Sequence, residues 1–185
     1  LSEKETFESG RALNQDLHFT EATNEFSIKK VEFNKGKYVS LGIINPDDEL
    51  YTNLAVLLSD ECEHSIKVAI FDGNDKKTFK DRKEFTGSLF KQLRNCYEYL
   101  KLCNHTAATF EGLDRIDRDD YPVSALREAL LNALVHRDYS FSGSIMINIF
   151  DDKVEFVSLG GLVSGLSKED ILRGVSQTRN HNLAN

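Results

Sequence analysis

The chain has 185 residues, with 23 basic and 30 acidic side chains, and therefore a formal net charge of −7. With 40% hydrophobic residues, 10% aromatic residues and only 2 prolines, it can bury a sizeable core as one full domain or two small ones, which excludes intrinsic disorder. With this excess of acidic side chains, the chain lacks the basic surface expected of an autonomous nucleic-acid binder. No apolar stretch is long enough to span a membrane.

Three cysteines, Cys62, Cys96 and Cys103, form no Cys-x-x-Cys pair and have no histidine at metal-ligand spacing. This odd, scattered set excludes a disulfide framework and a zinc site, and it indicates a reducing, cytoplasmic compartment. Leu1 is not an initiator methionine, and no basic region precedes an apolar core near the start. We therefore expect no signal peptide and interpret the sequence as part of a longer chain.

The first hundred residues predict short helices around one strand. Thr20 is a plausible N-cap for the first helix, and Asn45-Pro46-Asp47 marks a turn before the second. The expected elements are a helix over 19–31, a helix over 51–58, a strand over 66–71, an exposed basic connection over 76–83 and a helix over 88–102.

The remaining residues predict two short strands, a long helix and a hairpin. Pro122 and Ser124 mark the start of the long helix, and Asp151-Asp152-Lys153 forms the hairpin turn. The expected elements are strands over 106–110 and 112–116, a helix over 124–137, strands over 144–150 and 154–157, a glycine-rich loop holding Gly160, Gly161 and Gly165, and a short helix near 167. This order predicts an α/β (α+β) fold, with a mixed or antiparallel sheet from about Thr106 onward and helices on one face.

A row of polar side chains runs along one side of the helix expected over 124–137. Steps of about 100° per residue place Glu128, Asn132 and His136 in this row, between a row of alanines and Val135. Because the rest of the helix is apolar nearly all round, we expect the row to face a cavity and to need a partner or a ligand. The alternative is a solvated row, with His136 at the negative end of the helix dipole.

The spacing Glu128-x-x-x-Asn132 on a helix, followed by two antiparallel strands and a Gly-Gly loop, resembles the nucleotide-binding region of the gyrase, Hsp90, histidine-kinase and MutL (GHKL) superfamily. More narrowly, the chain is similar to the divergent ATPase-like module of bacterial RecG-related transcriptional regulators. The stretches that carry this resemblance are PVSALREALLNALVHRDYSFSG, IMINIFDDKVEF, GGLVSGLSKEDILRG and TRNHNLA. The earlier stretches YTNLAVLLSDE, IKVAIFDG and DRKEFTGSLFKQL resemble the linker region of the same proteins, in which a Schlafen-like AlbA DNA-binding domain usually precedes this region.

The resemblance implies a division into a linker α/β subdomain, residues 1–105, and a divergent, truncated GHKL ATPase-like domain, residues 106–185. It implies ATP and Mg²⁺ as cofactors, with Glu128 as general base and Asn132 as the magnesium ligand. His136, Asp138, Gly160 and Gly161 complete the implied nucleotide-binding set, and the roles of His136 and Asp138 can equally be structural. The implied function is that of a regulatory module of a transcriptional regulator, with DNA bound only through a separate module and with a homo-oligomer as a further expected partner.

Two departures from the superfamily pattern support a second hypothesis. The superfamily reads adenine with Asp-x-Gly-x-Gly after the second strand, whereas this chain has Ser158-Leu159-Gly160-Gly161. The glycine-rich lid segment that would cover the phosphates is expected beyond Asn185, so we expect ATP hydrolysis from a full-length protein and not from this segment. The alternative is a degenerate, ligand-free scaffold or oligomerisation domain that supports a DNA-binding module. A helicase motor is excluded because no Gly-x-x-x-x-Gly-Lys-Ser/Thr loop occurs.

Overall fold

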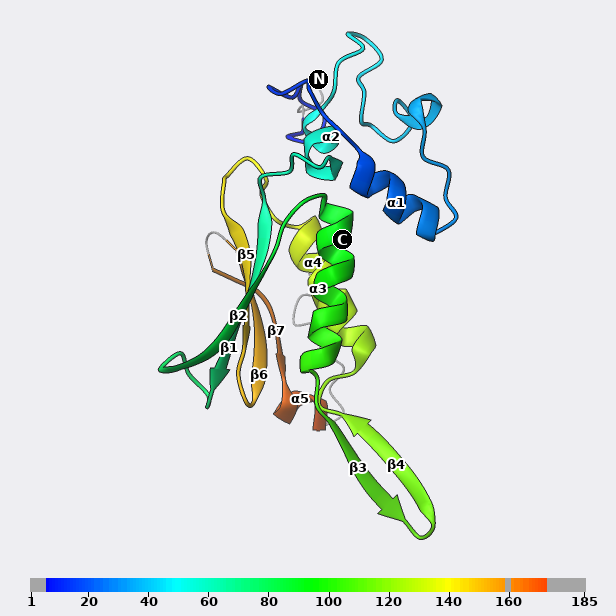
Figure 1. The fold of residues 1–185 in the computed structure, drawn as a ribbon. Helices are drawn as coiled ribbons and strands as arrows, with labels where there is room; N and C mark the ends of the chain where they lie inside the picture. Colours follow the sequence, from blue (N-terminus) through cyan, green and yellow to red (C-terminus); the bar gives the residue numbers. More distant parts are fainter. Residues whose placement is uncertain (1–5, 159–160, 173–185) are drawn as a thin grey trace, which may run out of the picture. The chain divides into compact units, whose positions relative to one another are not determined.

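The computed structural model describes residues 6–158 and 161–172, whose helices and strands are shown in Figure 1. In chain order they are α1 (Thr20–Ile28), the single 3-10 turn η1 (Lys35–Lys37), α2 (Asn53–Leu58), β1 (Ser65–Asp72), β2 (Thr78–Phe85), α3 (Leu89–Cys103), β3 (Thr106–Glu111), β4 (Asp114–Asp119), α4 (Val123–Val135), β5 (Ser144–Ile149), β6 (Lys153–Ser158), β7 (Gly161–Ser167) and α5 (Lys168–Leu172). This mixture of helices and a mixed sheet confirms the predicted α+β class.

The chain forms two compact units that interleave along the sequence. The first comprises Leu1–Ser65, Phe85–Arg94 and Asp138–Gly143, and the second comprises Ile66–Glu84, Asn95–Arg137 and Ser144–Asn185. These units are defined by internal contacts and do not follow a boundary at residue 105. The assignment of residues 1–105 to a linker subdomain and 106–185 to an ATPase-like domain stays a prediction.

The second unit is built on a five-stranded sheet with the order β2-β1-β5-β6-β7. β5 and β6 pair antiparallel, and the paired Ile147 and Phe156 are both fully buried. Ile145 is buried on the same face of β5 as Ile147, and Asn148 on the other face is buried as well. α4 packs against β6 and β7, as predicted for this helix (Figure 1).

β1 and β5 end at the same edge of this sheet. The N–H of Gly73, which follows β1, donates to the Asp151 carboxylate at 2.8 Å, and the Asp151 N–H donates to the Gly73 carbonyl at 3.0 Å. The rings of Phe71 and Phe150 stack beside these bonds with centroids 5.2 Å apart. Neighbouring strands whose carboxyl ends meet in this way run parallel, so the sheet is mixed.

Three local expectations were wrong. The sheet does not begin at Thr106, since β1 and β2 belong to it. The basic segment over 76–83 is no connection, because most of it forms β2, an exposed edge strand. The segment expected as a glycine-rich loop forms β7, which pairs with β6 along its length, with Gly165 opposite Glu155.

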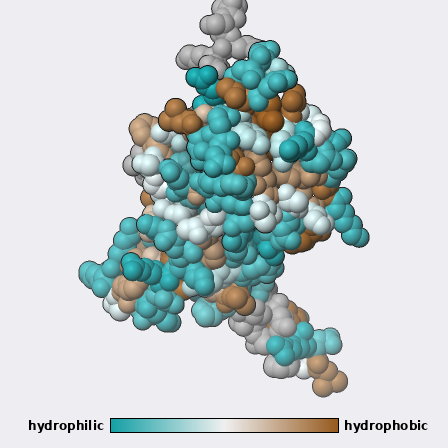
Figure 2. Space-filling view, turned by 45° about the horizontal axis from the view of Figure 1, so that its top comes forward, coloured by the Kyte–Doolittle hydropathy of each residue, from teal (hydrophilic) through white to brown (hydrophobic). Residues whose placement is uncertain are grey.

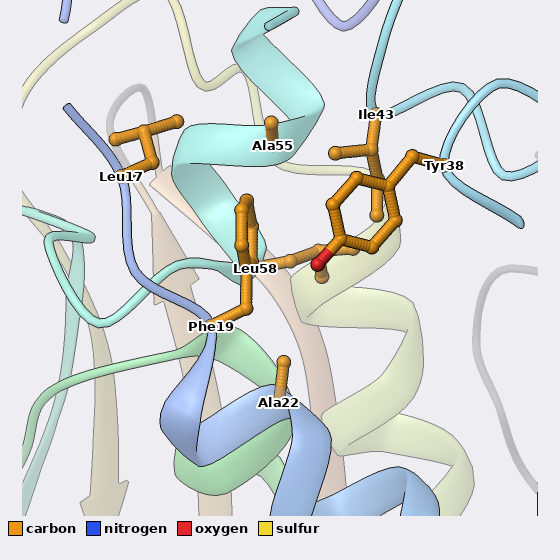
Figure 3. Packing of buried hydrophobic residues seen from close by; sticks show 7 residues of the cluster. All are labelled: Leu17, Phe19, Ala22, Tyr38, Ile43, Ala55 and Leu58. Atoms are coloured by element: carbon orange, nitrogen blue, oxygen red, sulfur yellow. The ribbon is translucent and has the colours of Figure 1, made fainter. Parts of the chain in front are cut away.

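The core of the first unit is an aromatic and aliphatic cluster between α1, α2 and the loop that joins them. Figure 3 shows Phe19 between Ala22 and Ala55, with Tyr38 on the neighbouring side. The Phe19 ring lies 5.6 Å from the Tyr38 ring, centroid to centroid. The buried members of this cluster are Leu17, Phe19, Ala22, Tyr38, Ile43, Ala55 and Leu58.

The start of α1 is capped by a residue distant in the sequence. The predicted N-cap, Thr20, is already the first helical residue, and Phe19 stands at the cap position without a side-chain bond. The Asp60 carboxylate instead accepts the N–H groups of Thr20 and Glu21, at 3.2 and 2.9 Å. A carboxylate at this place satisfies free N–H groups and lies at the positive end of the helix dipole.

Candidate functional site

The helix that carries the candidate residues, α4, buries one continuous side against β6 and β7. Pro122 precedes its first turn, and its carbonyl accepts the N–H groups of Ala125 and Leu126 at 3.0 and 3.2 Å. Proline suits this place because its fixed φ already matches the helix and it has no N–H to satisfy. The buried residues are Leu126, Ala129, Leu130, Ala133 and Leu134.

The polar row on α4 lies beside this buried side and faces outward at both ends. Glu128 and His136 are exposed and Asn132 is half-buried, while Val135 is 68% exposed. The expectation that the whole row faces a cavity was therefore wrong for Glu128 and His136, because β6 and β7 cover only the side that holds Ala129 and Ala133. The side chains of Glu128 and Asn132, one helical turn apart, make no hydrogen bond to another residue that the structure describes.

His136 and Asp138 have clear local contacts. His136 closes α4, where its N–H donates to the Asn132 carbonyl at 3.0 Å. The Asp138 carboxylate accepts the hydroxyl and the N–H of Ser140, at 2.5 and 2.9 Å. The hydrogen bond from the Ser140 hydroxyl lowers the pKa of the Asp138 carboxyl below its usual value, and the hydrogen bond from the Ser140 N–H adds to this shift. Asp138 belongs to the first unit, whereas Glu128, Asn132 and His136 belong to the second.

The neighbouring Tyr139 is a residue that the sequence analysis missed. It is buried in the first unit with Leu57 and Cys62, and its ring meets the His64 ring edge to face at 5.2 Å. The block His136-Arg137-Asp138-Tyr139 therefore ends in a hydrophobic anchor. A signal was present, because Tyr139 follows three charged or polar residues directly after the expected end of the helix.

The predicted glycines lie at the connection of β6 to β7. Gly161 opens β7 and pairs with Ser158, the last residue of β6, while Gly160 lies outside the described residues. The strand that Gly161 opens packs against α4, so this turn and the polar row belong to the same unit. Ser158, which stands where the superfamily pattern has aspartate, takes part in the sheet ladder.

Among the described residues, no group of three or more histidine, cysteine, aspartate or glutamate side chains is arranged to hold a metal ion. Among the same residues, no helix combines the length and the apolar character needed to cross a membrane.

Comparison with known proteins gives one family match and a fold. The model of a family described as "Putative ATP-dependent DNA helicase recG C-terminal" matches residues 143–185, which include β5, β6 and β7. No curated protein matches the chain. The crystal structure of the DIP2311 protein from Corynebacterium diphtheriae is similar, with a TM-score of 0.70 and 21% identity over 86% of this chain. The match covers 34% of that protein's chain, so the present sequence spans about a third of its length.

Proposed function

We propose that the chain is the ATPase-like regulatory part of a RecG-related transcriptional regulator, and that α4 binds a magnesium nucleotide through Glu128 and Asn132. The observation that carries this proposal is the pair itself. Two side chains with hard oxygen atoms stand one turn apart beside the buried side of α4, and neither is hydrogen bonded to another described residue. The family match over residues 143–185, which lies after α4, supports only the ATPase-like part of this proposal.

The residues present fit a magnesium nucleotide better than a metal held by protein alone. Mg²⁺ prefers oxygen ligands, keeps several waters and is often bound through one or two side chains plus substrate phosphates. The Asn132 amide oxygen would be such a ligand, and the Glu128 carboxylate would accept the proton of a water that attacks the terminal phosphate.

The proposed role in transcription depends on a separate DNA-binding module. Two lysines in and before β2 have acidic neighbours, since Lys77 Nζ lies 3.5 Å from Asp75 Oδ2 and Lys80 Nζ lies 3.7 Å from Asp72 Oδ1. With a net charge of −7 the chain has little attraction for phosphates. We expect the isolated chain to bind duplex DNA weakly or not at all at physiological salt, and a gel-shift titration measures this.

A ligand-free scaffold is the second candidate, and the observation that favours it is Ser158. This residue pairs with Gly161 in the β6–β7 ladder where the superfamily pattern has its adenine-reading aspartate. The exposure of Glu128 fits a scaffold as well, because a solvated carboxylate needs no partner.

Calorimetry separates the two candidates. The wild-type chain is titrated with a non-hydrolysable magnesium–ATP analogue, with and without magnesium, and compared with Asn132→Ala and with Ser124→Ala. Ser124 is an exposed residue on the same helix, so its substitution is the matched control. The proposal expects magnesium-dependent heat that Asn132→Ala abolishes and Ser124→Ala keeps. Absence of heat at millimolar analogue leaves the scaffold as the function.

A further inference from the structure

Residues 28–41 of the first unit combine lysines with exposed aliphatic side chains. They run from the end of α1 through η1 into the loop that follows it (Figure 1). Four lysines and one glutamate give this stretch a local charge of +3, whereas the whole chain has a net charge of −7. We call residues 28–41 the lysine segment, and its lysines are Lys29, Lys30, Lys35 and Lys37.

The aliphatic side chains of the lysine segment are open to solvent. Ile28, Val31 and Val39 are 53%, 52% and 50% exposed, and Leu41 is 39% exposed. Eleven large hydrophobic residues are exposed in the described part of the chain, and these four lie within fourteen residues of sequence. Figure 2 shows hydrophobic atoms among hydrophilic ones on one face of the molecule. A single exposed apolar residue is ordinary on a protein surface, but a group of them marks an interaction site.

Aromatic rings that turn inward hold the lysine segment in place. The Phe33 ring stacks on the Phe26 ring of α1 with centroids 4.6 Å apart, and it lies 5.3 Å from the ring of the buried Tyr38. The Val31 N–H donates to the Phe26 carbonyl at 2.9 Å. The backbone is therefore fixed on the first unit, while the lysines and the aliphatic side chains stay exposed.

Most of the positive charge of the segment is unpaired. Lys37 Nζ lies 3.8 Å from Glu32 Oε2, a contact that also brings η1 next to the residues that follow α1. The other three lysines form no ion pair with another residue that the structure describes. All four lysines are exposed.

The two carboxylates of α1 do not offset this charge. Glu21 Oε1 lies 2.9 Å from Lys91 Nζ, and Glu25 Oε1 lies 2.7 Å from Arg94 Nη2. Both carboxylates are thus paired with cations of α3. The lysine segment is therefore a basic and apolar surface on an acidic chain.

We infer that the lysine segment docks on the surface of an anionic lipid bilayer. Lysine ammonium groups near a bilayer are attracted to anionic headgroups, and the attraction acts within a Debye length of the surface. The exposed aliphatic side chains would enter the boundary between the headgroups and the acyl chains, as the apolar residues of interfacial segments do. Charge and apolar contact then act on the same small surface.

The exposed side chains favour a bilayer over a protein or a nucleic acid as the partner. No exposed side chain of the segment is an arginine or an aromatic residue. Protein interfaces are enriched in both and depleted in lysine. Base readout commonly uses arginine, and single-stranded nucleic acids stack on aromatic side chains. The phosphates of a duplex would attract the lysines but would give the aliphatic side chains nothing to contact.

Cosedimentation with vesicles tests the inference. The wild-type chain is expected to sediment with phosphatidylcholine vesicles that contain phosphatidylserine and to stay in solution with phosphatidylcholine alone. Salt at about 1 M, where the Debye length is about 3 Å, should release most of the bound chain. No binding to either vesicle, or equal binding to both, overturns the inference.

Charge reversal locates the binding surface. The double substitution Lys29→Glu with Lys30→Glu should weaken binding to the phosphatidylserine vesicles at least about tenfold. The matched control is Lys76→Glu with Lys77→Glu, an exposed lysine pair between β1 and β2. The control changes the net charge equally and should weaken binding less than about threefold. Equal losses in the two variants would mean that net charge alone governs binding and would overturn the inference.

Removal of the aliphatic side chains separates a bilayer from DNA. Val31→Ser with Val39→Ser should weaken vesicle binding about fivefold, whereas Leu102→Ser, at an 84% exposed leucine of α3, should not. A gel shift with duplex DNA is run beside it. A wild-type chain that binds the duplex but not the vesicles, and loses this binding on lysine reversal, overturns the bilayer in favour of DNA.

A fluorescent reporter tests contact with the bilayer directly. The chain has no tryptophan, so Val39→Trp introduces a single reporter in the lysine segment. Its emission is expected to shift to shorter wavelength with phosphatidylserine vesicles and to be quenched by brominated acyl chains. Leu102→Trp is the control and should show neither change. The same response from both positions, or no response from Val39→Trp, overturns the inference.

Discussion

The buried carboxylate of Glu25 is held by the guanidinium of Arg94, with Nε and Nη2 both bonded to Oε1 at 2.8 and 2.7 Å. The two residues join α1 to the first half of α3 within the first unit. The Glu25 side chain is 8% exposed and the Arg94 side chain is 44% exposed. The buried carboxylate therefore needs this cation to replace its lost hydration, whereas the guanidinium remains in contact with water. Loss of the arginine would leave a buried charge without its partner.

We therefore predict that Arg94→Ala lowers the free energy of unfolding by about 2–3 kcal/mol. Urea denaturation followed by circular dichroism measures the change. In a Glu25→Ala background the same substitution should cost less than about 1 kcal/mol, because no buried charge remains. Equal costs in both backgrounds would contradict the role given to the pair.

A second prediction concerns the capping of α1 by Asp60. Asp60→Ala removes the acceptor for two free N–H groups and should destabilise the chain by about 1 kcal/mol. Thr20→Ala should change stability by less than about 0.5 kcal/mol, since Thr20 is a helical residue and not the cap. The measurement is the urea midpoint of each variant, and a larger effect for Thr20→Ala would restore the sequence-based assignment of the cap.

This cap illustrates what the sequence could not disclose. The helix itself was predictable from its local apolar spacing, but its cap comes from a residue 40 positions away and depends on the tertiary fold. β2 was missed for a related reason. Seven of its eight residues are exposed, so it lacks the alternation by which a strand is recognised, and only pairing with β1 shows it to be a strand.

For the candidate site, the sequence predicted the local spacing of the residues on the helix but not the exposure of their side chains. One helical turn between Glu128 and Asn132 is a local property, and the helix was expected correctly over nearly its whole length. The exposure of each side chain depends on which side of α4 the strands β6 and β7 cover, and no local pattern gives that. Glycines at 160, 161 and 165 suggested a loop, yet backbone pairing with β6 holds most of this segment as β7.

A third prediction uses the pH dependence of the His18–Glu61 ion pair, in which Nδ1 and Oε1 are 2.5 Å apart. The hydrogen bond and the charge of Glu61 raise the pKa of His18 above 6.5. Burial alone would raise the pKa of Glu61, but hydrogen bonds from His18 outweigh it and lower that pKa below 4.5. The contribution of His18 to the free energy of unfolding is complete below pH 6.5 and is lost as the pH rises through the higher pKa of the folded state.

The contribution of the Glu61 carboxylate to the free energy of unfolding is complete above pH 4.5 and is lost as the pH falls through the lower pKa of the folded state. The pair should therefore stabilise the chain most between pH 4.5 and 6.5. The difference in melting temperature between the wild type and His18→Gln is expected to peak in that window and to shrink at alkaline pH. A difference that grows above pH 8 would contradict this assignment.

A fourth prediction concerns the anchor that follows α4. Tyr139→Ala removes a buried ring from its contacts with Leu57 and Cys62 and should cost about 3 kcal/mol. Phe141→Ala, two residues on, removes a ring that is 55% exposed and should cost less than about 1 kcal/mol. Both are measured by urea denaturation, and similar costs for the two would show that Tyr139 is no anchor.

The last prediction separates chemistry from binding at α4. Glu128→Gln keeps the size and polarity of the side chain and removes only its ability to accept a proton. If Glu128 is the general base, nucleotide affinity should change by less than about threefold, while phosphate release by a full-length protein should fall by at least about 100-fold. Glu63→Gln, an exposed glutamate in the first unit, is the matched control and should leave both quantities unchanged. Calorimetry gives the affinity and a phosphate-release assay gives the turnover. Unchanged turnover in Glu128→Gln would remove Glu128 from the reaction, and lost affinity would make it a ligand of the nucleotide complex instead of its base.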